Sequence, residues 1–234
     1  MPSVPLYDEF GDWATPKESS AGHFFAPMNV EHSLGFESTA APATPWPLFS
    51  RWFADAQVTR LAEPAAMTLA TVAADGAPSA RVVLLRGFDE SGFTFYTNYQ
   101  SRKADEIATN ARVALVFFWD ELKRQVRLEG TARPVSAAES DAYFQSRPRG
   151  HRLSALISPQ SAVIPDRRFL EERMKALEEQ YAGRDDIPRP PHWGGYRVAP
   201  TMIEFWQGRE NRLHDRLCYR RLSDGSWKCE RLAP

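Results

Sequence analysis

Five strand-like segments follow one another between Met67 and Val135, and this run constrains the fold more than any other feature of the sequence. The segments are rich in Val, Leu, Phe, Thr and Tyr, and turn signals such as Ala74-Asp-Gly76 separate them. They span residues 67–72, 80–88, 93–98, 112–119 and 123–135. The pattern predicts an antiparallel meander, and because such a sheet must protect its edges, we expect it to close into a small barrel.

Helical signals lie on both sides of this run and within it. Thr44 and Pro45 supply an N-cap and a first-turn proline for one helix, and Ser136 and Glu139 form a capping box for another, which Pro148 ends. Further helices are expected at residues 102–109 and 166–181, and further strands at residues 196–198, 202–207, 212–222 and 227–232. With the later helices packed on the barrel, the expected fold class is α+β and mainly β.

The first 43 residues differ from the rest in composition and in periodicity. They carry Pro, Gly, Ser and Ala without a sustained period, and we interpret residues 1–43 as a loosely structured N-terminal arm. Residues 44–234 are expected to form a single domain, because a chain of 234 residues with 43% hydrophobic side chains can bury a sizeable core.

The charge is balanced, with 29 basic and 30 acidic residues. This balance gives no general attraction to nucleic acid and favours a small phosphate-bearing ligand held by local clusters. Neither a signal peptide nor an apolar run long enough to cross a bilayer is found, so we expect no membrane association and a cytoplasmic location. The two cysteines are expected to be small buried side chains, and the scattered histidines indicate no metal site.

A cationic row beside an aromatic ring is expected near the C-terminus. Within residues 204–216, strand alternation places Arg212, His214 and Arg216 on one face, close to Trp206. Because like charges on neighbouring positions of one face repel, the row favours an anionic or electron-rich ligand. A solvated strand face is the alternative.

A second candidate site is the helix start after Tyr96-Thr-Asn98. Ser101 is placed as the N-cap, and Arg102 and Lys103 bring two cations to a helix end that already favours an anion. These residues predict a phosphate-binding site. The alternative is a solvated helix start whose cations are neutralised by Asp105 and Glu106.

Other polar positions carry weaker signals. Arg81 and Arg86 bracket four apolar residues, and strand alternation puts them on opposite faces, one toward a ligand and the other toward a partner surface. Gln125 and the pair Gln160-Ser161 are suited to hydrogen-bonding the edge of a heterocycle, or are ordinary surface polar residues.

Several fragments of the chain occur together in a fixed order. They are Arg81-Val-Val-Leu-Leu-Arg86, Phe95-Tyr-Thr-Asn98, Ser101-Arg-Lys103, Arg124-Gln-Val126, Tyr143-Phe-Gln-Ser-Arg-Pro-Arg149, Ser158-Pro-Gln-Ser161, Trp193-Gly-Gly-Tyr-Arg197, Glu204-Phe-Trp-Gln-Gly208, Arg212-Leu-His-Asp-Arg216 and Arg231-Leu-Ala-Pro234. Taken together, they resemble the pyridoxamine 5'-phosphate oxidase family over residues 45–234. The resemblance implies an antiparallel FMN-binding split β-barrel and a homodimer that binds two FMN molecules at the subunit interface.

The resemblance also implies roles for individual residues. Carried over by position, the FMN contacts are Arg81, Val82, Val83, Leu84, Leu85, Arg86, Tyr96, Thr97, Ser101, Arg102, Lys103, Gln125, Gln160, Ser161, Trp206 and Arg216. The substrate contacts are Arg86, Tyr143, Arg147, His151, Arg212 and His214, with Arg212 and His214 as the catalytic pair.

The implied activity is the FMN-dependent oxidation of pyridoxamine or pyridoxine 5'-phosphate to pyridoxal 5'-phosphate, with O2 as acceptor and H2O2 released. Three features depart from the family pattern: Arg86 stands where a lysine is usual, His151 where a serine is usual, and the arm lacks an Arg-x-x-Tyr pattern. Because these departures concern the substrate, two alternatives stay open. One is an FMN-dependent oxidase acting on another ring, as in phenazine-tailoring relatives, and the other is a non-catalytic flavin or pyridoxal phosphate carrier.

Overall fold

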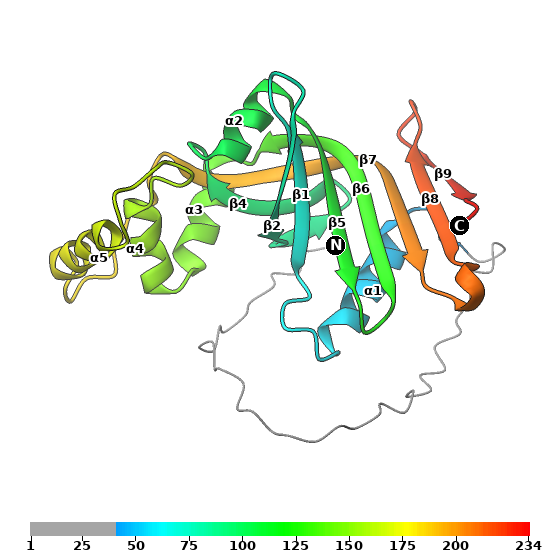
Figure 1. Cartoon of the computed structure of the whole chain (residues 1–234), viewed down its shortest axis with the longest axis horizontal. Helices are drawn as coiled ribbons and strands as arrows, with labels where there is room; N and C mark the ends of the chain where they lie inside the picture. Colours follow the sequence, from blue (N-terminus) through cyan, green and yellow to red (C-terminus); the bar gives the residue numbers. More distant parts are fainter. Residues whose placement is uncertain (1–40) are drawn as a thin grey trace.

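The computed structural model describes residues 41–234, which form one nine-stranded antiparallel sheet flanked by helices (Figure 1). The arm expected at residues 1–43 therefore lies outside the described residues, except at its end. There the backbone oxygen of Pro42 accepts a hydrogen bond of 3.1 Å from the hydroxyl of Tyr219, and Ala41 packs against the main core. The last residues of the predicted arm thus contact the folded body.

The strands confirm most of the sequence predictions. They are β1 (Ala66–Val72), β2 (Pro78–Leu84), β3 (Gly87–Asp89), β4 (Gly92–Asn98), β5 (Arg112–Trp119), β6 (Arg124–Pro134), β7 (Trp193–Gln207), β8 (Asp215–Arg221) and β9 (Trp227–Arg231). The strand predicted at residues 80–88 is interrupted, because Leu85 turns into the core and is fully buried. The two strands predicted at residues 196–198 and 202–207 are the ends of the single long strand β7.

The order of the strands is not that of a meander. It runs β2-β1-β5-β6-β7-β4-β3, with β8 beside β7 and β9 beside β8. The helix α2 (Arg102–Thr109) separates β4 from β5, so β4 pairs with the distant β7 and β5 pairs with β1. Among the described residues β2 and β3 stay at the two ends of this order, and the sheet is therefore a split barrel rather than a closed one.

The strand β7 connects the two halves of the sheet. It pairs with β4 through residues 193–198 and with β8 through residues 202–207, and β6 lies along nearly its whole length. The register with β6 shifts between Glu129 and Gly130. A Cβ atom at Gly130 would lie 2.3 Å from the backbone oxygen of Ala199, so this close approach of the two strands requires glycine.

The helix α1 (Trp46–Gln57) anchors the main core. Its buried side chains recur at helical spacing as predicted, and the ring of Phe49 lies 4.8 Å from that of Phe93 and 5.4 Å from that of Phe117. Full burial of a side chain of this kind contributes about 1.5–3 kcal/mol. The N-cap predicted at Thr44 is wrong: Pro45 occupies this position, where its restricted φ suits the helix start without a side-chain hydrogen bond.

A second, smaller core lies among the helices drawn at the left of Figure 1. It joins α3 (Ala137–Ser146) and α4 (Arg149–Ile157) through Phe144, Leu153 and Trp193. The capping box of α3 is confirmed. The helix α4 was not predicted, because it begins immediately after the proline that ends α3.

The helix α5 (Arg168–Gln180) confirms the prediction of a helix but not its packing. It packs mainly on α4, and none of its described side chains is buried. Met174 and Leu177 from its apolar stripe are partly buried against the second core.

The cysteines differ in environment. Cys218 on β8 is buried, whereas Cys229 on the edge strand β9 is exposed, so the prediction of buried cysteines is wrong for Cys229. Across residues 41–234, no helix has the length and apolar character needed to span a membrane.

Candidate active site

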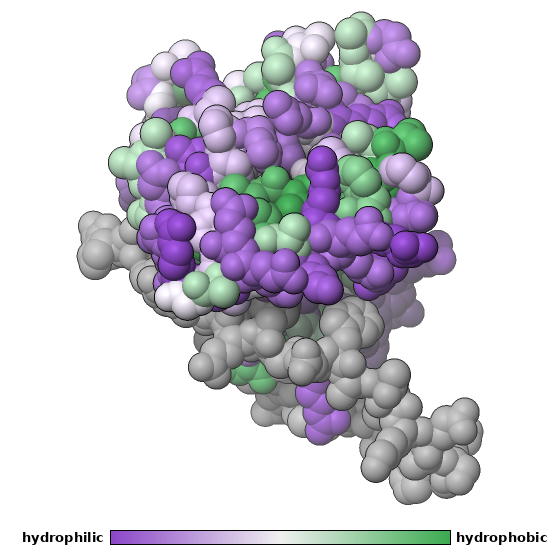
Figure 2. Space-filling model, turned by 90° about the vertical axis from the view of Figure 1, so that its left-hand side faces the viewer, coloured by the Kyte–Doolittle hydropathy of each residue, from purple (hydrophilic) through white to green (hydrophobic). Residues whose placement is uncertain are grey.

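A cavity of about 810 Å³ lies between the sheet and the helices α3 to α5. Its walls come from β2, β4 and the start of α2 on one side and from α3, α4 and α5 on the other. Figure 2 shows the face of the molecule on which these helices lie, which is mainly hydrophilic with hydrophobic residues gathered near its centre. The size of the cavity is that of a site for a cofactor or a small organic ligand.

Lys103 brings a buried positive charge to this cavity. Its ammonium Nζ donates to Thr97 Oγ1 and Ser101 Oγ, both at 3.2 Å, and to Gln160 Oε1 at 2.8 Å. Burial lowers the pKa of Lys103, the charge of Arg81 lowers it further, and Glu106 opposes both. All three hydrogen-bond partners are neutral, and among the described residues no carboxylate forms an ion pair with Lys103. A buried ammonium in this state favours an anionic ligand.

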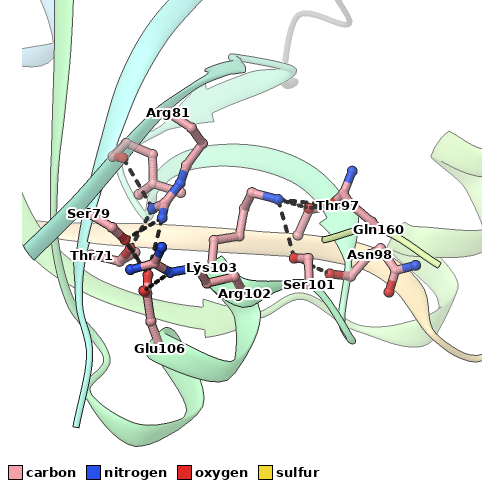
Figure 3. A network of polar contacts seen from close by, with 11 residues as sticks. Thr71, Ser79, Arg81, Thr97, Asn98, Ser101, Arg102, Lys103, Glu106 and Gln160 are labelled. Atoms are coloured by element: carbon pink, nitrogen blue, oxygen red, sulfur yellow. Dashed lines mark hydrogen bonds and ion pairs between the residues drawn. The ribbon is translucent and has the colours of Figure 1, made fainter. Parts of the chain in front are cut away.

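Two arginines lie beside Lys103, and both contact Glu106 (Figure 3). Arg81 Nη2 lies 3.1 Å from Glu106 Oε2, and Arg102 Nε lies 2.8 Å from Glu106 Oε1. Hydrogen bonds from Ser79 and Thr71, and then from the two arginines, lower the pKa of Glu106 to about 2 although burial opposes them. We call Arg81, Arg102 and Lys103 the Lys103 cluster. Glu106 therefore forms ion pairs with the two arginines, whereas the hydrogen-bond partners of Lys103 are all neutral.

Ser101 occupies the predicted N-cap position, but its side chain does not cap the helix. Its hydroxyl donates to the backbone oxygen of Asn98 at 2.7 Å and accepts from Lys103. The serine therefore orients the lysine instead of satisfying the backbone N–H groups of the first turn.

A second group of basic side chains also borders the cavity. Arg86, Arg147 and His151, which we call the Arg147 cluster, all border the cavity together with Tyr143. Burial and then the charges of Arg147 and Arg86 lower the pKa of His151. Arg147 Nη1 is buried and has no hydrogen-bond partner among the described residues. Two guanidinium groups beside a histidine of lowered pKa, with an unsatisfied donor on Arg147, favour a second anion here.

Aromatic rings form a flat part of the wall next to these arginines. The ring of Tyr96 is stacked on that of Tyr143 at 3.9 Å and on that of Trp193 at 5.4 Å. The guanidinium of Arg147 lies 4.6 Å from the Trp193 ring, a distance typical of a cation–π contact. Burial, with the nearby charge of Glu139, raises the pKa of Tyr96 to about 12, so this hydroxyl keeps its proton.

The prediction that Arg81 and Arg86 face opposite ways is wrong. β2 ends at Leu84, so strand alternation no longer applies at Arg86, and both arginines line the same cavity. Leu85, between them, points into the main core and is fully buried.

The predicted cationic row of the C-terminal hairpin is also wrong in its geometry. The strand β8 begins only at Asp215, and Arg212 lies in a 3₁₀ turn (Glu210–Arg212) with a φ of 59°. The preceding Asn211 has a φ of 54°, which breaks the alternation expected of a strand. Arg212 is exposed at this turn, whereas Arg216 lies on the strand.

His214 is nevertheless held in a defined orientation. Its ring lies 4.7 Å from that of Trp206, and its Nδ1 accepts the backbone N–H of Arg209 at 3.1 Å. Because Nδ1 is the acceptor, the proton of the ring sits on Nε2, which is left as a hydrogen-bond donor. Arg209 is itself fixed by an ion pair of 2.8 Å with Asp215.

Arg216 is paired on the opposite strand. Its Nε lies 2.8 Å from Oε1 of the buried Glu204, and its Nη1 donates to the backbone oxygen of Ala233 at 2.8 Å. Trp206 lies across from Arg216 in the register of β7 and β8, and Gln125 lies across from Trp206 on β6. Gln125, Trp206 and Arg216 therefore lie side by side on three neighbouring strands.

The structure therefore divides the predicted site residues into two groups. The cavity is lined by Arg81, Val82, Val83, Leu84, Arg86, Tyr96, Thr97, Lys103, Tyr143, Arg147, His151 and Gln160. The remaining residues lie outside its lining: Leu85, Ser101, Arg102, Gln125, Ser161, Trp206, Arg212, His214 and Arg216. Gln125, Trp206, Arg212, His214 and Arg216 are referred to below as the hairpin group.

Sequence reasoning missed several residues of the cavity. Ser154, Ala155 and Ile157 come from the unpredicted α4, and Met174 comes from α5. The signal for α4 was present, since Pro148 is as compatible with the start of a helix as with the end of one. Trp193 was noted as part of a family fragment without a role, and it proves to be the ring beneath Arg147.

The open antiparallel sheet with a cationic cavity on its flank defines a protein of the FMN-binding split-barrel class. Comparison with protein families narrows this class. Residues 53–181 match the family described as pyridoxamine 5'-phosphate oxidase, and residues 193–234 match the pyridoxine 5'-phosphate oxidase C-terminal dimerisation region. The chain belongs to the pyridoxamine 5'-phosphate oxidase family.

Individual relatives agree with this assignment. The chain is 59% identical over 196 residues to a pyridoxine/pyridoxamine 5'-phosphate oxidase of Acaryochloris marina, covering 84% of this chain and 89% of that protein. It is 56% identical over 209 residues to the corresponding protein of Burkholderia cenocepacia, covering 88% and 96%. Among solved structures, PhzG of Burkholderia lata in complex with tetrahydrophenazine-1-carboxylic acid matches with a TM-score of 0.81 and 33% identity, covering 87% of this chain and 98% of that one.

Proposed function

We propose that this protein is an FMN-dependent oxidase that converts pyridoxamine or pyridoxine 5'-phosphate to pyridoxal 5'-phosphate, with O2 as acceptor and H2O2 as by-product. With the amine substrate, water is consumed as well and the nitrogen leaves as ammonia. The observation that carries the proposal is that two groups of basic side chains, Arg81 with Lys103 and Arg86 with Arg147 and His151, line one cavity. A cofactor and a substrate that each bear a phosphate need two anion sites, and the Lys103 and Arg147 clusters provide them. The named relatives, at 55–59% identity over most of their length, support the same activity.

The Lys103 cluster fits the phosphate of FMN. Lys103 has neutral partners and a lowered pKa, so a phosphate beside it would supply the missing negative charge. Arg81 already lies in the cavity wall. Thr97 and Gln160, which also line the cavity, hydrogen-bond to Lys103 and keep its ammonium there. Bound there, FMN would supply the redox chemistry, taking two electrons from the substrate carbon and passing them to O2.

The Arg147 cluster is proposed to hold the substrate phosphate. Arg147 offers Nη1, which has no hydrogen-bond partner among the described residues, and Arg86 adds a charge that a phosphate dianion would neutralise. His151 would take up a proton when the phosphate binds. Tyr143, stacked on Tyr96, would limit the positions open to the substrate ring. Binding energy from the phosphate can then be used to align the reacting carbon.

The hairpin group is proposed to act in the cavity of a second copy, so that the working enzyme is a homodimer. Trp193 borders the cavity and Trp206 lies beside His214, yet both belong to β7. Thirteen residue steps of strand lead from one to the other, roughly 40 Å along the strand path at about 3.3 Å per step. A single flavin does not bridge that span, and the match of residues 193–234 to a dimerisation region supports completion by a partner.

In that arrangement, Arg212 and His214 would contact the substrate next to the flavin. His214 would donate a hydrogen bond through Nε2, because Arg209 occupies its Nδ1. Arg212 would add positive charge near an electron-rich ring, and Arg216, held by Glu204, would stabilise negative charge on the reduced cofactor. These roles assign binding and charge stabilisation to the protein and leave electron transfer to the cofactor.

A second candidate is oxidation of a phenazine-type ring, because PhzG shares the fold at a TM-score of 0.81. Its 33% identity is well below the 59% shared with the Acaryochloris marina protein. A carrier without catalysis is a further alternative, which the exposed Arg212 and the oriented His214 disfavour.

One experiment tests these candidates together. Oxygen consumption by the FMN-loaded protein is measured with pyridoxine phosphate, pyridoxamine phosphate and a reduced phenazine precursor. We expect turnover with the two phosphorylated vitamers. Turnover with the phenazine precursor alone would replace the proposal by the second candidate, and no turnover of any of them would favour the carrier.

A further inference from the structure

Glu106 is a buried carboxylate on which the hydrogen bonds at the left of Figure 3 converge. It lies on α2 with only 5% of its surface exposed, and it accepts from Thr71 on β1, Ser79 and Arg81 on β2, and Arg102 on its own helix. No sequence signal assigned it a role beyond neutralising neighbouring cations. Its four donors come from three different elements that meet beside the cavity.

The two oxygens of the carboxylate divide the arginines between them. Oε1 accepts from Arg102 Nε at 2.8 Å, and Oε2 accepts from Arg81 Nη2 at 3.1 Å and from Ser79 Oγ at 2.6 Å. Arg81 is further held by the backbone oxygen of Leu69 at 3.3 Å. Two guanidinium groups that share one carboxylate are kept close together despite their repulsion.

The charges of this region add up to a simple balance. Arg81, Arg102 and Lys103 carry three positive charges and Glu106 carries one negative charge, so the net charge is +2. A phosphate monoester near neutral pH carries about −2. Glu106 therefore leaves a net charge that a phosphate dianion matches.

A carboxylate near a phosphate site could instead oppose the anion. Glu106 does not line the cavity, however, and the donors on its two oxygens direct its charge toward the arginines. Because both guanidinium groups offset the charge of the carboxylate, we expect its orienting effect on Arg81 and Arg102 to outweigh its direct repulsion of the anion.

We propose that Glu106 is a positioning residue for the cofactor phosphate, because its carboxylate holds Arg81 in the cavity wall where this phosphate binds and pairs with Arg102 just outside that wall. This inference rests on the proposed function, in that the Lys103 cluster must bind the phosphate of FMN. It adds a residue that touches neither the cofactor nor the cavity.

The test compares the binding of FMN with that of riboflavin, which lacks the phosphate. Full-length protein stripped of flavin is titrated with each, and the quenching of flavin fluorescence gives the two Kd values. Replacing Glu106→Gln should weaken FMN binding by roughly tenfold, the scale of a hydrogen bond to a charged group, while riboflavin binding changes less than about twofold. A role in overall folding alone would change both affinities equally.

Glu172→Gln is the matched control. Glu172 pairs with Arg168 at 3.2 Å with the same i,i+4 spacing as Arg102 and Glu106, but on α5 and at the surface. Its removal should leave both affinities unchanged. Glu106→Asp keeps the charge on a shorter side chain and should restore part of the FMN affinity lost in the glutamine variant.

Two results would contradict the inference itself. FMN binding that is unchanged or tighter in Glu106→Gln would overturn the role of Glu106, and so would equal losses of FMN and riboflavin binding. Should the glutamine variant fail to fold, Glu106→Asp decides the same question by whether its loss is confined to FMN. Wild-type protein that binds riboflavin as tightly as FMN would overturn the phosphate site itself, which separates failure of the proposed function from failure of this inference.

Discussion

The guanidinium carbon of Arg147 lies 4.6 Å from the centre of the Trp193 ring, and its Nη1 is buried without a hydrogen-bond partner among the described residues. The contact fixes the arginine against a wall of the cavity while leaving a donor for a ligand. Arg147 is thus held in place before any anion arrives, which lowers the entropy lost on binding.

The first prediction follows from this contact. Arg147→Ala should raise the KM for pyridoxine phosphate by about tenfold or more, because a charged hydrogen bond to the substrate phosphate is lost, while the flavin content stays normal. Steady-state kinetics and the flavin absorbance of the purified protein measure the two effects. Arg173→Ala, which removes a cation–π contact with Phe169 outside the cavity, is the control. An unchanged KM in Arg147→Ala would exclude this arginine from the substrate site.

The second prediction concerns the pH dependence given by His151. Burial and the charges of Arg147 and Arg86 lower the pKa of His151, so it is neutral in the empty cavity at neutral pH. A bound phosphate raises this pKa again, and binding therefore takes up a proton. The affinity for the substrate phosphate should therefore fall as the pH rises between two pKa values of His151, the lowered one of the empty site and the raised one of the complex.

The measurement is the KM for pyridoxine phosphate between pH 6 and 8.5, the interval around the ordinary histidine pKa of about 6.5. We expect the KM of the wild type to rise with pH and that of His151→Gln to depend on pH much less. Parallel profiles for the two proteins would show that the titration belongs to another group.

The third prediction separates stability from binding at Lys103. Its ammonium is buried among neutral partners, so Lys103→Met should leave the Tm of the flavin-free protein unchanged or higher and should weaken FMN binding by at least about tenfold. Thermal unfolding without flavin and a flavin titration measure both. Lys175→Met, at an exposed position of α5, is expected to change neither. A large fall in Tm with normal FMN affinity would assign a purely structural role to Lys103.

The fourth prediction tests whether one copy completes the site of another. Arg147→Ala affects the cavity, and Arg212→Ala affects the hairpin group, so each variant alone should have low activity. In a mixed dimer, the intact cavity of one subunit meets the intact hairpin of the other and forms one working site out of two. Random mixing should then recover about a quarter of wild-type activity. No recovery, in a mixture shown by mass to contain mixed dimers, would place both residues in the site of a single chain.

Local features of this fold were predictable from the sequence because short-range chemistry sets them. The capping box at Ser136 and Glu139 starts α3 as predicted, and the glycine turn at Gly76, with a φ of 86°, joins β1 to β2. The helix after Ser101 also has the predicted bounds. Each of these signals acts within a few residues, where side-chain and backbone preferences dominate.

The strand order was not predictable in this way. The meander was the simplest arrangement of the predicted strands, but β4 pairs with residues 193–198, about a hundred positions later in the chain. No local pattern encodes such a contact, which depends on how well whole faces of the sheet pack.

The same limit of local patterns explains why the site was predicted only in part. Lys103 was identified by residue type and position and Arg147 by the family resemblance, whereas the facing of Arg86 and Arg212 was wrong because each lies just outside a strand. Periodicity applies only inside a regular element, and ligand-binding residues are often at its ends. Glu106 shows the complementary limit, since its four contacts become visible only when three elements are brought together.

The loose attachment of α5 has a consequence for the divergence of such proteins. This helix borders the cavity through Leu170 and Met174 but rests on α4 and buries none of its described side chains. Its sequence can therefore change without disturbing the strands and the cluster around Lys103. In proteins that share this architecture, the part of the cavity wall formed by α5 can therefore change to accept other ring systems, while the Lys103 cluster that binds the cofactor phosphate stays the same.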